Sequence, residues 1–186
     1  MSRLPTLSAT EVTSDRLVLR KARDTDREGL IEIFTDPEVR AYLGGPVPRS
    51  EMEKFLDAFG TANTTSEPGS FIVADKPTQR LIGILGLGRR SADRPGHLTE
   101  DGEELELSYV LRRGAWGAGL AFEAATAALR AAVDELPDQP VLVVTQTANE
   151  RALKLAVRLG FQPVDTFEQF DAEQTLSTAT LHTFKA

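Results

Sequence analysis

The chain has 186 residues, of which 41% are hydrophobic and 26% charged, and its formal net charge is −7. This size and composition indicate one domain, residues 1–186, that can bury its own core, and residues 1–12 are expected to form a flexible N-terminal segment. The negative charge argues against general nucleic-acid binding, which needs a basic surface, and the absence of cysteine excludes disulfides and thiolate nucleophiles.

Membrane association and metal binding also lack support in the sequence. No apolar run approaches the roughly 18 residues of a membrane span. The N-terminus has no apolar core of a signal peptide, so we expect a cytoplasmic protein without a membrane partner. His97 and His182 are far apart and lack ligand spacing, so we expect no metal site.

The N-terminal part of the chain predicts one strand and two helices. Residues 16–20 alternate between polar and apolar side chains, as a strand does. Asp24 is the predicted N-cap of a helix that reaches Phe34. Ser50 and Glu53 have the spacing of a capping box, which predicts a second helix.

The middle of the chain predicts three strands and a long helix. Residues 71–74 and 80–88 read as two strands joined by a hairpin-type connection, and residues 104–111 alternate as a third. Between them, residues 91–102 are polar and predict a surface loop, either at a substrate entrance or as a tolerated insertion. Residues 118–133 are rich in Ala and Leu, which predicts a helix.

The C-terminal part predicts a strand, a helix and two further strands. Residues 140–145 form an apolar run typical of a buried strand. Asn149 suits the N-cap of the following helix, and Gly160 suits its C-terminal end. Residues 166–170 and 176–184 predict two strands, which we expect to be antiparallel.

Three glycines stand where the third strand leads into the long helix. Gly114, Gly117 and Gly119 would let a ligand approach the main chain closely, and the N–H groups of a helix N-terminus attract phosphate oxygens. The segment lacks the Lys-Ser/Thr ending of a P-loop and the third small residue of a dinucleotide fingerprint. From the residues alone, pyrophosphate binding and a plain tight turn both remain open.

The glycine-rich segment and the helix from Asn149 to Phe161, in this order and about 30 residues apart, strongly resemble the GCN5-related N-acetyltransferase (GNAT) superfamily. Residues 13–20, followed by Asp24 and Asp26 and by Asp36-Pro37, resemble its RimJ/RimL-like branch. The resemblance implies an α/β (α+β) fold with a mixed, mostly antiparallel sheet of about seven strands, flanked by about four helices.

The resemblance further implies an acetyl-CoA donor and a primary-amine acceptor, such as a protein or peptide N-terminus, an amino acid or a small amine. In the family, the strand corresponding to residues 109–111 splays from its neighbour and leaves main-chain groups for the pantetheine arm. The implied CoA-binding residues are Val110, Leu111, Arg112, Arg113, Gly114, Trp116, Gly117, Ala118, Gly119, Leu120 and Asn149. Gly114 replaces a position that is often Gln or Arg in the family, which leaves the backbone donors of the loop, and Arg112 or Arg113 could supply the missing side-chain contact.

Some of these residues also have a simpler interpretation. Asn149 could cap its helix as well as contact the pantetheine arm. Trp116, the sole tryptophan, could cover the cofactor or anchor the helix in the core.

A carboxylate base is expected because a protonated amine cannot attack a thioester. Glu106 is the first candidate, since it lies three residues before Tyr109 in a string that resembles a family segment, and Glu104 is the reserve. The alternative is that both are ordinary solvated carboxylates.

The expected proton donor is missing, because Ala152 and Ala156 stand where the family often has Ser or Tyr. Ser108, Tyr109 or water would have to substitute, or no acid is needed, because a thiolate leaves readily. This departure motivates a second hypothesis, a catalytically silent acyl-CoA-binding or regulatory module. A third is a transferase of another acyl group, such as succinyl.

Acceptor-binding residues are expected from 41–69 and 91–102, neither of which contains a recognisable motif. The acceptor itself is therefore not predicted. Superfamily members often form dimers, so the resemblance allows a homodimer.

Overall fold

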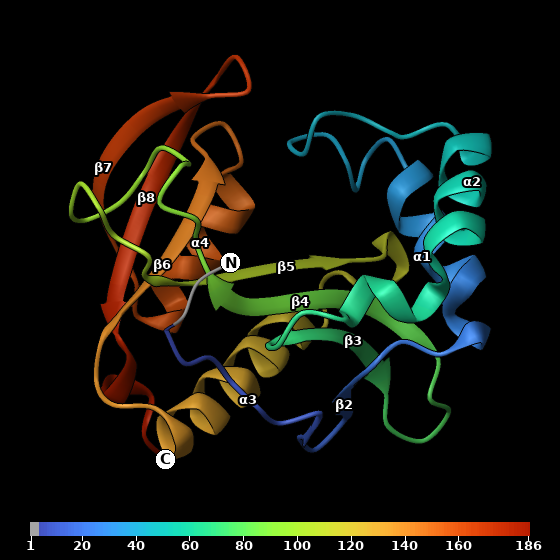
Figure 1. Ribbon diagram of the computed structural model, residues 1–186, viewed down its shortest axis with the longest axis horizontal. Coiled ribbons are helices and arrows are strands. Elements are labelled where there is room, and N and C mark those ends of the chain that lie inside the picture. Colours follow the sequence, from blue (N-terminus) through green and yellow to red (C-terminus); the bar gives the residue numbers. More distant parts are fainter. Residues whose placement is uncertain (1–3) are drawn as a thin grey trace.

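The computed structural model describes residues 4–186, which form one mixed eight-stranded sheet with helices on both faces (Figure 1). The strand order is β1-β2-β3-β4-β5-β6-β8-β7, and every neighbouring pair is antiparallel except β5 and β6. The strands are β1 (Glu11–Thr13), β2 (Leu17–Arg20), β3 (Ser70–Asp75), β4 (Leu81–Arg89), β5 (Leu105–Leu111), β6 (Pro140–Gln146), β7 (Gln162–Gln169) and β8 (Ala172–Thr180). The helices are α1 (Arg27–Thr35), α2 (Arg49–Phe59), α3 (Leu120–Glu135) and α4 (Glu150–Leu159).

The expected α/β fold is confirmed, with eight strands where about seven were expected. The additional strand is β1, which pairs with β2 at the edge of the sheet. It lies partly within the segment predicted to be flexible. In the same segment Leu7 is fully buried and Ser8 N donates to Glu135. Residues 1–3 lie outside the described residues, and the flexibility of residues 1–12 stays a prediction.

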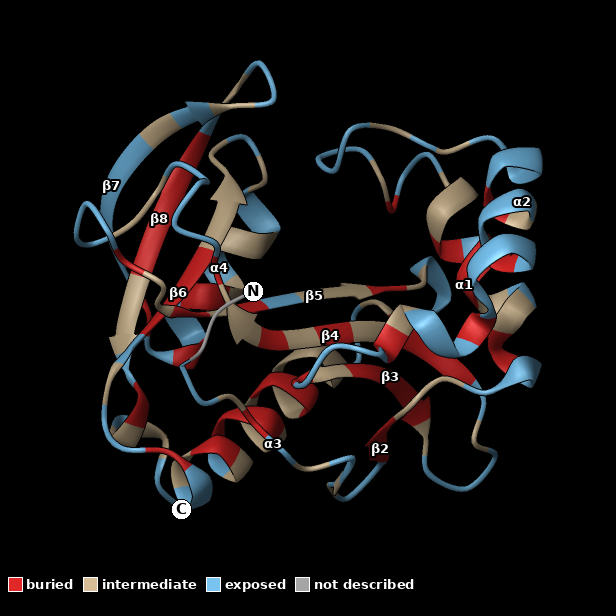
Figure 2. Cartoon of the chain, in the orientation of Figure 1, coloured by how far each residue is buried: buried red, intermediate tan, exposed pale blue. Residues whose placement is uncertain are grey.

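The two faces of the sheet carry separate apolar cores. Phe71 and Val73 of β3 pack with β5 and α3 on one face, while Ile72 and Ala74 pack with α1 and α2 on the other. This division follows from the alternation of side chains along a strand. Figure 2 shows the resulting buried stripe along α3, which faces the sheet.

The starts of the two N-terminal helices, α1 and α2, differ from the predicted ones. Asp24 lies in a short 3₁₀ turn and is not the cap of α1. Asp26 is the residue whose carboxylate accepts from Arg23 N, at 2.7 Å, and it also pairs with the buried Arg20. The capping box at Ser50 is absent because α2 begins at Arg49, two residues earlier than a cap at Ser50 implies, and its N-cap is Pro48, whose fixed φ suits a helix start.

The last predicted strand is displaced along the chain. A strand was expected over residues 176–184, whereas β8 ends at Thr180, and residues 181–184 form a 3₁₀ turn around the buried Leu181. The end of β8 is set by pairing, because Thr180 lies opposite Pro140, the first residue of β6. Sequence pattern alone does not contain this register.

The single parallel pair is also the junction with the fewest paired positions in the sheet. β5 and β6 each have seven residues, yet they pair only at Leu105–Val141 and Glu106–Leu142. Beyond these positions the two strands diverge, while β6 stays paired with β8 along its whole length. The sheet therefore splits into a part next to α1 and α2 and a part next to α4 (Figure 1).

Candidate active site

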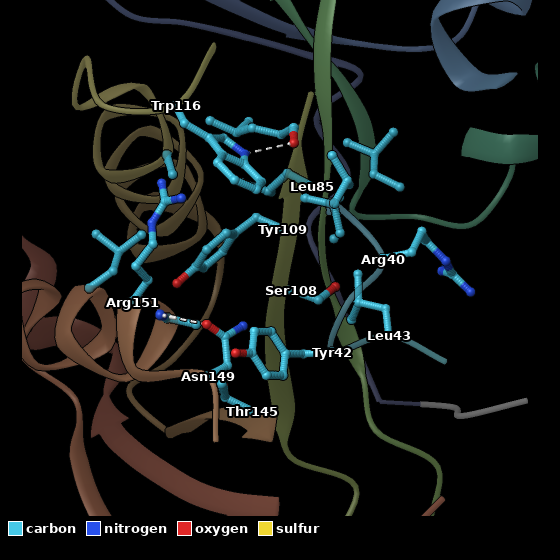
Figure 3. A pocket seen from close by; sticks show the side chains of 18 of the residues that line it. Arg40, Tyr42, Leu43, Leu85, Ser108, Tyr109, Trp116, Thr145, Asn149 and Arg151 are labelled. Atoms are coloured by element: carbon cyan, nitrogen blue, oxygen red, sulfur yellow. Dashed lines mark hydrogen bonds between the residues drawn. The ribbon is translucent and has the colours of Figure 1, made fainter. Parts of the chain in front are cut away.

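The divergence of β5 and β6 opens a pocket with a volume of about 1250 Å³. One side is lined by the start of α3 and by α4, and the other side by α1, α2 and the segment between them. Figure 3 shows side chains from both sides, with Tyr109 and Ser108 of β5 between them.

The glycine-rich loop presents its main chain to this pocket. Gly117 and Gly119 both line it and have left-handed φ values of 83° and 76°. A Cβ atom at Gly117 would meet no atom within 4 Å, so space is open beside the loop. The following helix α3 has no side-chain hydrogen bond at its N-cap, which leaves its first amides to an external acceptor.

An ion-paired carboxylate holds this loop in place from behind. Glu123, in the first turn of α3, accepts hydrogen bonds from Ser14 Oγ at 2.5 Å and Arg16 Nε at 2.7 Å. Arg16 Nη1 in turn donates to Ala118 O, at 3.0 Å. The chain before β2 is thereby tied to the glycine-rich loop, which favours one fixed loop conformation.

Helix α4 begins and ends as predicted. Asn149 is its N-cap, with the side chain accepting from Ala152 N at 3.2 Å, and Gly160 closes it with a φ of 111°. Asn149 and Ala152 also line the pocket, whereas Ala156 is buried beneath the helix. Neither alanine carries a hydroxyl.

Three basic side chains of α4 line the pocket. None of them was predicted from the sequence as a site residue. They are Arg151, Lys154 and Arg158. The Arg151 guanidinium lies 4.2 Å from the centre of the Trp116 ring. The spacing of three and then four residues is a detectable signal, because it places all three on one helix face. These cations suit a ligand with several negative charges.

Trp116 packs against the core and also lines the pocket. Its ring packs against both apolar cores, its Nε1 donates to Leu111 O at 3.0 Å, and it lines the pocket. It therefore anchors the loop to β5 and forms part of the pocket wall.

Tyr109 carries a buried polar atom without a partner. Its hydroxyl is inaccessible to solvent and has no hydrogen-bond partner among the described residues. Burial raises the pKa of the Tyr109 phenol to about 12, so the group stays neutral and can donate. In Figure 3 the ring points from β5 towards α4, near Asn149 and Arg151. An unsatisfied buried hydroxyl costs free energy that a ligand acceptor would recover.

The two candidate carboxylates do not line the pocket. Glu106 Oε2 accepts from Arg90 Nη1 at 2.8 Å, and its other oxygen lies 3.8 Å from Arg94 Nη1. Glu104 Oε2 lies 2.8 Å from His97 Nδ1, and Oε1 accepts from Leu98 N. Both carboxylates therefore hold the 91–102 loop.

Residues 91–102 do not line the pocket themselves, whereas several residues between 41 and 69 do. The predicted CoA-binding residues divide in a similar way. The following line the pocket: Val110, Leu111, Trp116, Gly117, Gly119, Leu120 and Asn149. Arg112, Arg113, Gly114 and Ala118 do not. Arg112 pairs with Glu32 at 3.3 Å, and Arg113 pairs with Asp36, so both arginines face the α1 side.

Within residues 4–186, no group of three or more His, Cys, Asp or Glu side chains is arranged to hold a metal ion. In the same described part of the chain, every helix is too short or too polar to span a bilayer.

A family model described as acetyltransferase (GNAT) domain matches residues 16–162, which is most of the chain. The chain belongs to the GNAT acetyltransferase family. The matched range contains β5, the glycine-rich loop and α4, so the pocket walls on both sides of the strand divergence lie within the family domain.

Individual relatives are distant but cover most of this family member. It is 26% identical over 152 residues to the uncharacterised N-acetyltransferase p20 of Bacillus licheniformis, covering 80% of each chain. It is 25% identical to the uncharacterised protein YkkB of Bacillus subtilis, over 87% of this chain and 91% of that protein.

Solved structures share the fold at lower identity. A GNAT-family acetyltransferase from Bacillus anthracis superposes with a TM-score of 0.73 at 17% identity, covering 92% of this chain and 99% of that one. Spermidine N-acetyltransferase from Vibrio cholerae, in complex with CoA and spermine, gives a TM-score of 0.67 at 16% identity with the same coverage.

Proposed function

We propose that this protein is an acetyl-CoA-dependent N-acetyltransferase that moves an acetyl group to a primary amine. The observation that carries the proposal is the divergence of β5 and β6 beside an open glycine-rich loop, since it provides an extended slot that ends at unpaired helix amides. A fold neighbour crystallised with CoA and the amine spermine supports this pair of ligand classes.

The residues around the slot fit acetyl-CoA in charge and shape. The amides of Gly117, Gly119 and Leu120 would hold the pyrophosphate, with Arg151 and Lys154 on α4 adding positive charge. The unpaired edges of β5 and β6 would hold the pantetheine arm in the manner of an added strand. The bound donor supplies an acetyl group activated as a thioester.

We propose Glu106 as the base that takes the amine proton, acting through a water molecule. It shares a strand face with Ser108, two residues on, which lines the pocket. Glu104 is the weaker candidate because its two oxygens are occupied by His97 and Leu98 N.

Glu106→Gln tests the base directly. Glutamine keeps an oxygen for Arg90 but cannot take a proton, so we expect turnover to fall by roughly 100-fold or more. Acetyl-CoA affinity should be unchanged, as measured by calorimetry. Wild-type turnover in this variant would mean that Glu106 only anchors the 91–102 loop.

We propose Tyr109 as the donor group in the slot, in the place left by Ala152 and Ala156. A phenol with a pKa of about 12 holds its proton firmly. Donation of a hydrogen bond to the reacting group is therefore favoured over full proton transfer. The expelled thiolate needs no stronger acid.

The experiment that tests the function is a CoA-thiol release assay with acetyl-CoA against a panel of amines, amino acids and peptides. Amine-dependent release establishes a transferase. Tight acetyl-CoA binding without release by any acceptor would instead favour a silent acyl-CoA-binding module, which the two alanines of α4 motivate. Faster release from succinyl-CoA would indicate a transferase of another acyl group.

The RimJ/RimL-like branch, a cytoplasmic location and a homodimer remain predictions from the sequence. The branch would favour acceptors at protein N-termini, and the same panel of peptides tests it.

A further inference from the structure

The part of the pocket that lies across β5 from α4 is built mainly from apolar side chains. They come from α1, from α2 and from the segment between these helices: Phe34, Tyr42, Leu43 and Phe55, together with the buried Leu30, Val39 and Met52. Because α1 and α2 stand away from α4, this wall lies opposite the basic helix that suits the phosphates of the donor (Figure 1). It is therefore the wall that an acceptor would meet.

Several of these side chains are left open to solvent. Leu43 is 44% exposed, Phe55 is 41% exposed and Tyr42 is 40% exposed. Figure 3 shows Tyr42 and Leu43 among the side chains that line the pocket together with Ser108. A cluster of large apolar side chains that borders a pocket gains free energy when an apolar ligand covers it.

Negative charge is scarce in the same pocket. Among the described residues that line it, Glu38 is the single carboxylate, and its Oε1 already lies 3.0 Å from Arg113 Nη1. The charged side chains that remain are cationic, with Arg40 on this side and the basic residues on α4. For a second ammonium group the only lining carboxylate among the described residues would be Glu38, which is already paired with Arg113, and the other charged groups would repel it.

We propose that the acceptor is a small monoamine whose single amino group is carried by a compact apolar body, either aromatic or aliphatic. Diamines and polyamines are disfavoured. This inference rests on the proposed transferase function and adds the substrate class to it. The apolar body packs against the α1–α2 wall, which leaves the amino group to point towards β5 and the acetyl donor.

Matched amines test this inference in the CoA-thiol release assay. Pentylamine and cadaverine have the same carbon chain and differ by one amino group, and phenethylamine and spermidine extend the comparison. We expect kcat/KM for pentylamine to exceed that for cadaverine by about 10-fold or more, since burying the apolar end is favourable and burying an ammonium is not. Phenethylamine should likewise exceed spermidine.

Two variants test whether the α1–α2 wall sets the preference for monoamines over diamines. Leu43→Glu adds a carboxylate to the pocket lining, so we expect the ratio of cadaverine to pentylamine activity to rise by about 10-fold. Leu4→Glu is the matched control, because Leu4 is similarly exposed, at 50%, and does not line the pocket. The ratio of cadaverine to pentylamine activity in this control should equal that of the wild type.

Binding provides a readout that does not depend on turnover. Trp116, the sole tryptophan, lines the pocket, so its fluorescence with CoA bound should change on titration with pentylamine more than with cadaverine. Cadaverine or spermidine as the better substrate, or activity restricted to peptides, would overturn the inference while the transferase function stands. Acetyl-CoA binding without release by any amine would overturn the transferase function as well.

Discussion

At the scale of single residues, we expect the hydroxyl of Tyr109 to contribute to activity and not to stability. It is buried and has no partner in the described part of the chain, so it contributes nothing evident to the fold. A buried polar group without a partner is a good candidate for contact with a ligand.

Tyr109→Phe should therefore lower turnover without lowering stability. Removing an unsatisfied buried hydroxyl leaves the free energy of unfolding unchanged or raises it by about 1 kcal/mol. Loss of one hydrogen bond to the reacting group should reduce kcat by about 10-fold. Urea unfolding and steady-state kinetics measure the two effects. A variant that is less stable and fully active would contradict the assignment.

At the scale of elements, the junction of the glycine-rich loop and α3 depends on backbone conformation and on one anchored carboxylate. Gly117 has a left-handed φ that other residues adopt at a cost of about 1–2 kcal/mol. Glu123 fixes the first turn of α3 from the opposite side. The two features act on the same loop by different means.

Gly117→Val should weaken CoA binding by about 10-fold or more, because it disfavours the loop conformation and fills the open space beside the main chain. Gly45→Val is a suitable control, since Gly45 also has a positive φ, of 83°, with open space around it, and does not line the pocket. Calorimetric titration with CoA compares the variants. If Gly117→Val and Gly45→Val bind CoA with equal affinity, the glycine-rich loop is not part of the CoA-binding site.

Glu123→Gln should lower stability at neutral pH and have little effect in acid. Burial opposes ionisation of Glu123, but the hydrogen bonds from Ser14 and Arg16 outweigh it and lower the pKa of the carboxyl below 4.5. The unfolded state therefore binds the proton more readily, so the carboxylate stabilises the fold above about pH 4.5, and this contribution is lost as the pH falls further.

Thermal unfolding from pH 7 downwards measures this difference. The difference in Tm between the wild type and Glu123→Gln should become smaller as the pH falls below 4.5. A gap that stays constant across this range would show that ionisation of Glu123 does not contribute.

At the scale of the whole molecule, two parts of the sheet meet at a short junction. Only Leu105–Val141 and Glu106–Leu142 pair across it, so a ligand in the slot would contact both parts at once. Binding to the folded state alone stabilises a protein by mass action.

CoA at about 100 times its dissociation constant should raise the free energy of unfolding by about 2.7 kcal/mol. In a domain of this size, that corresponds to an increase in Tm of roughly 5–10 °C. Scanning calorimetry with CoA, with free adenosine diphosphate and with pantetheine would test whether the whole ligand is needed. If pantetheine alone raises Tm as much as CoA does, the contacts of the glycine-rich loop with the ligand do not contribute to this stabilisation.

The sequence by itself determined the class of fold and the positions of the elements that border the pocket. Alternation at residues 104–111, the three glycines and the capped helix from Asn149 are local patterns, because they depend on backbone preferences of neighbouring residues. For that reason β5, the loop and α4 were found close to their predicted positions. The basic face of α4 was equally local and could have been found by its spacing.

Only the tertiary structure decided which of these residues meet. Glu104 and Glu106 have the residue type of a base, yet their partners Arg90 and His97 come from the preceding segment and turn them towards the 91–102 loop. The end of β8 and the apolar wall opposite α4 depend on strand register and on helix packing. These properties come from contacts between segments far apart in the chain, and no local pattern contains them.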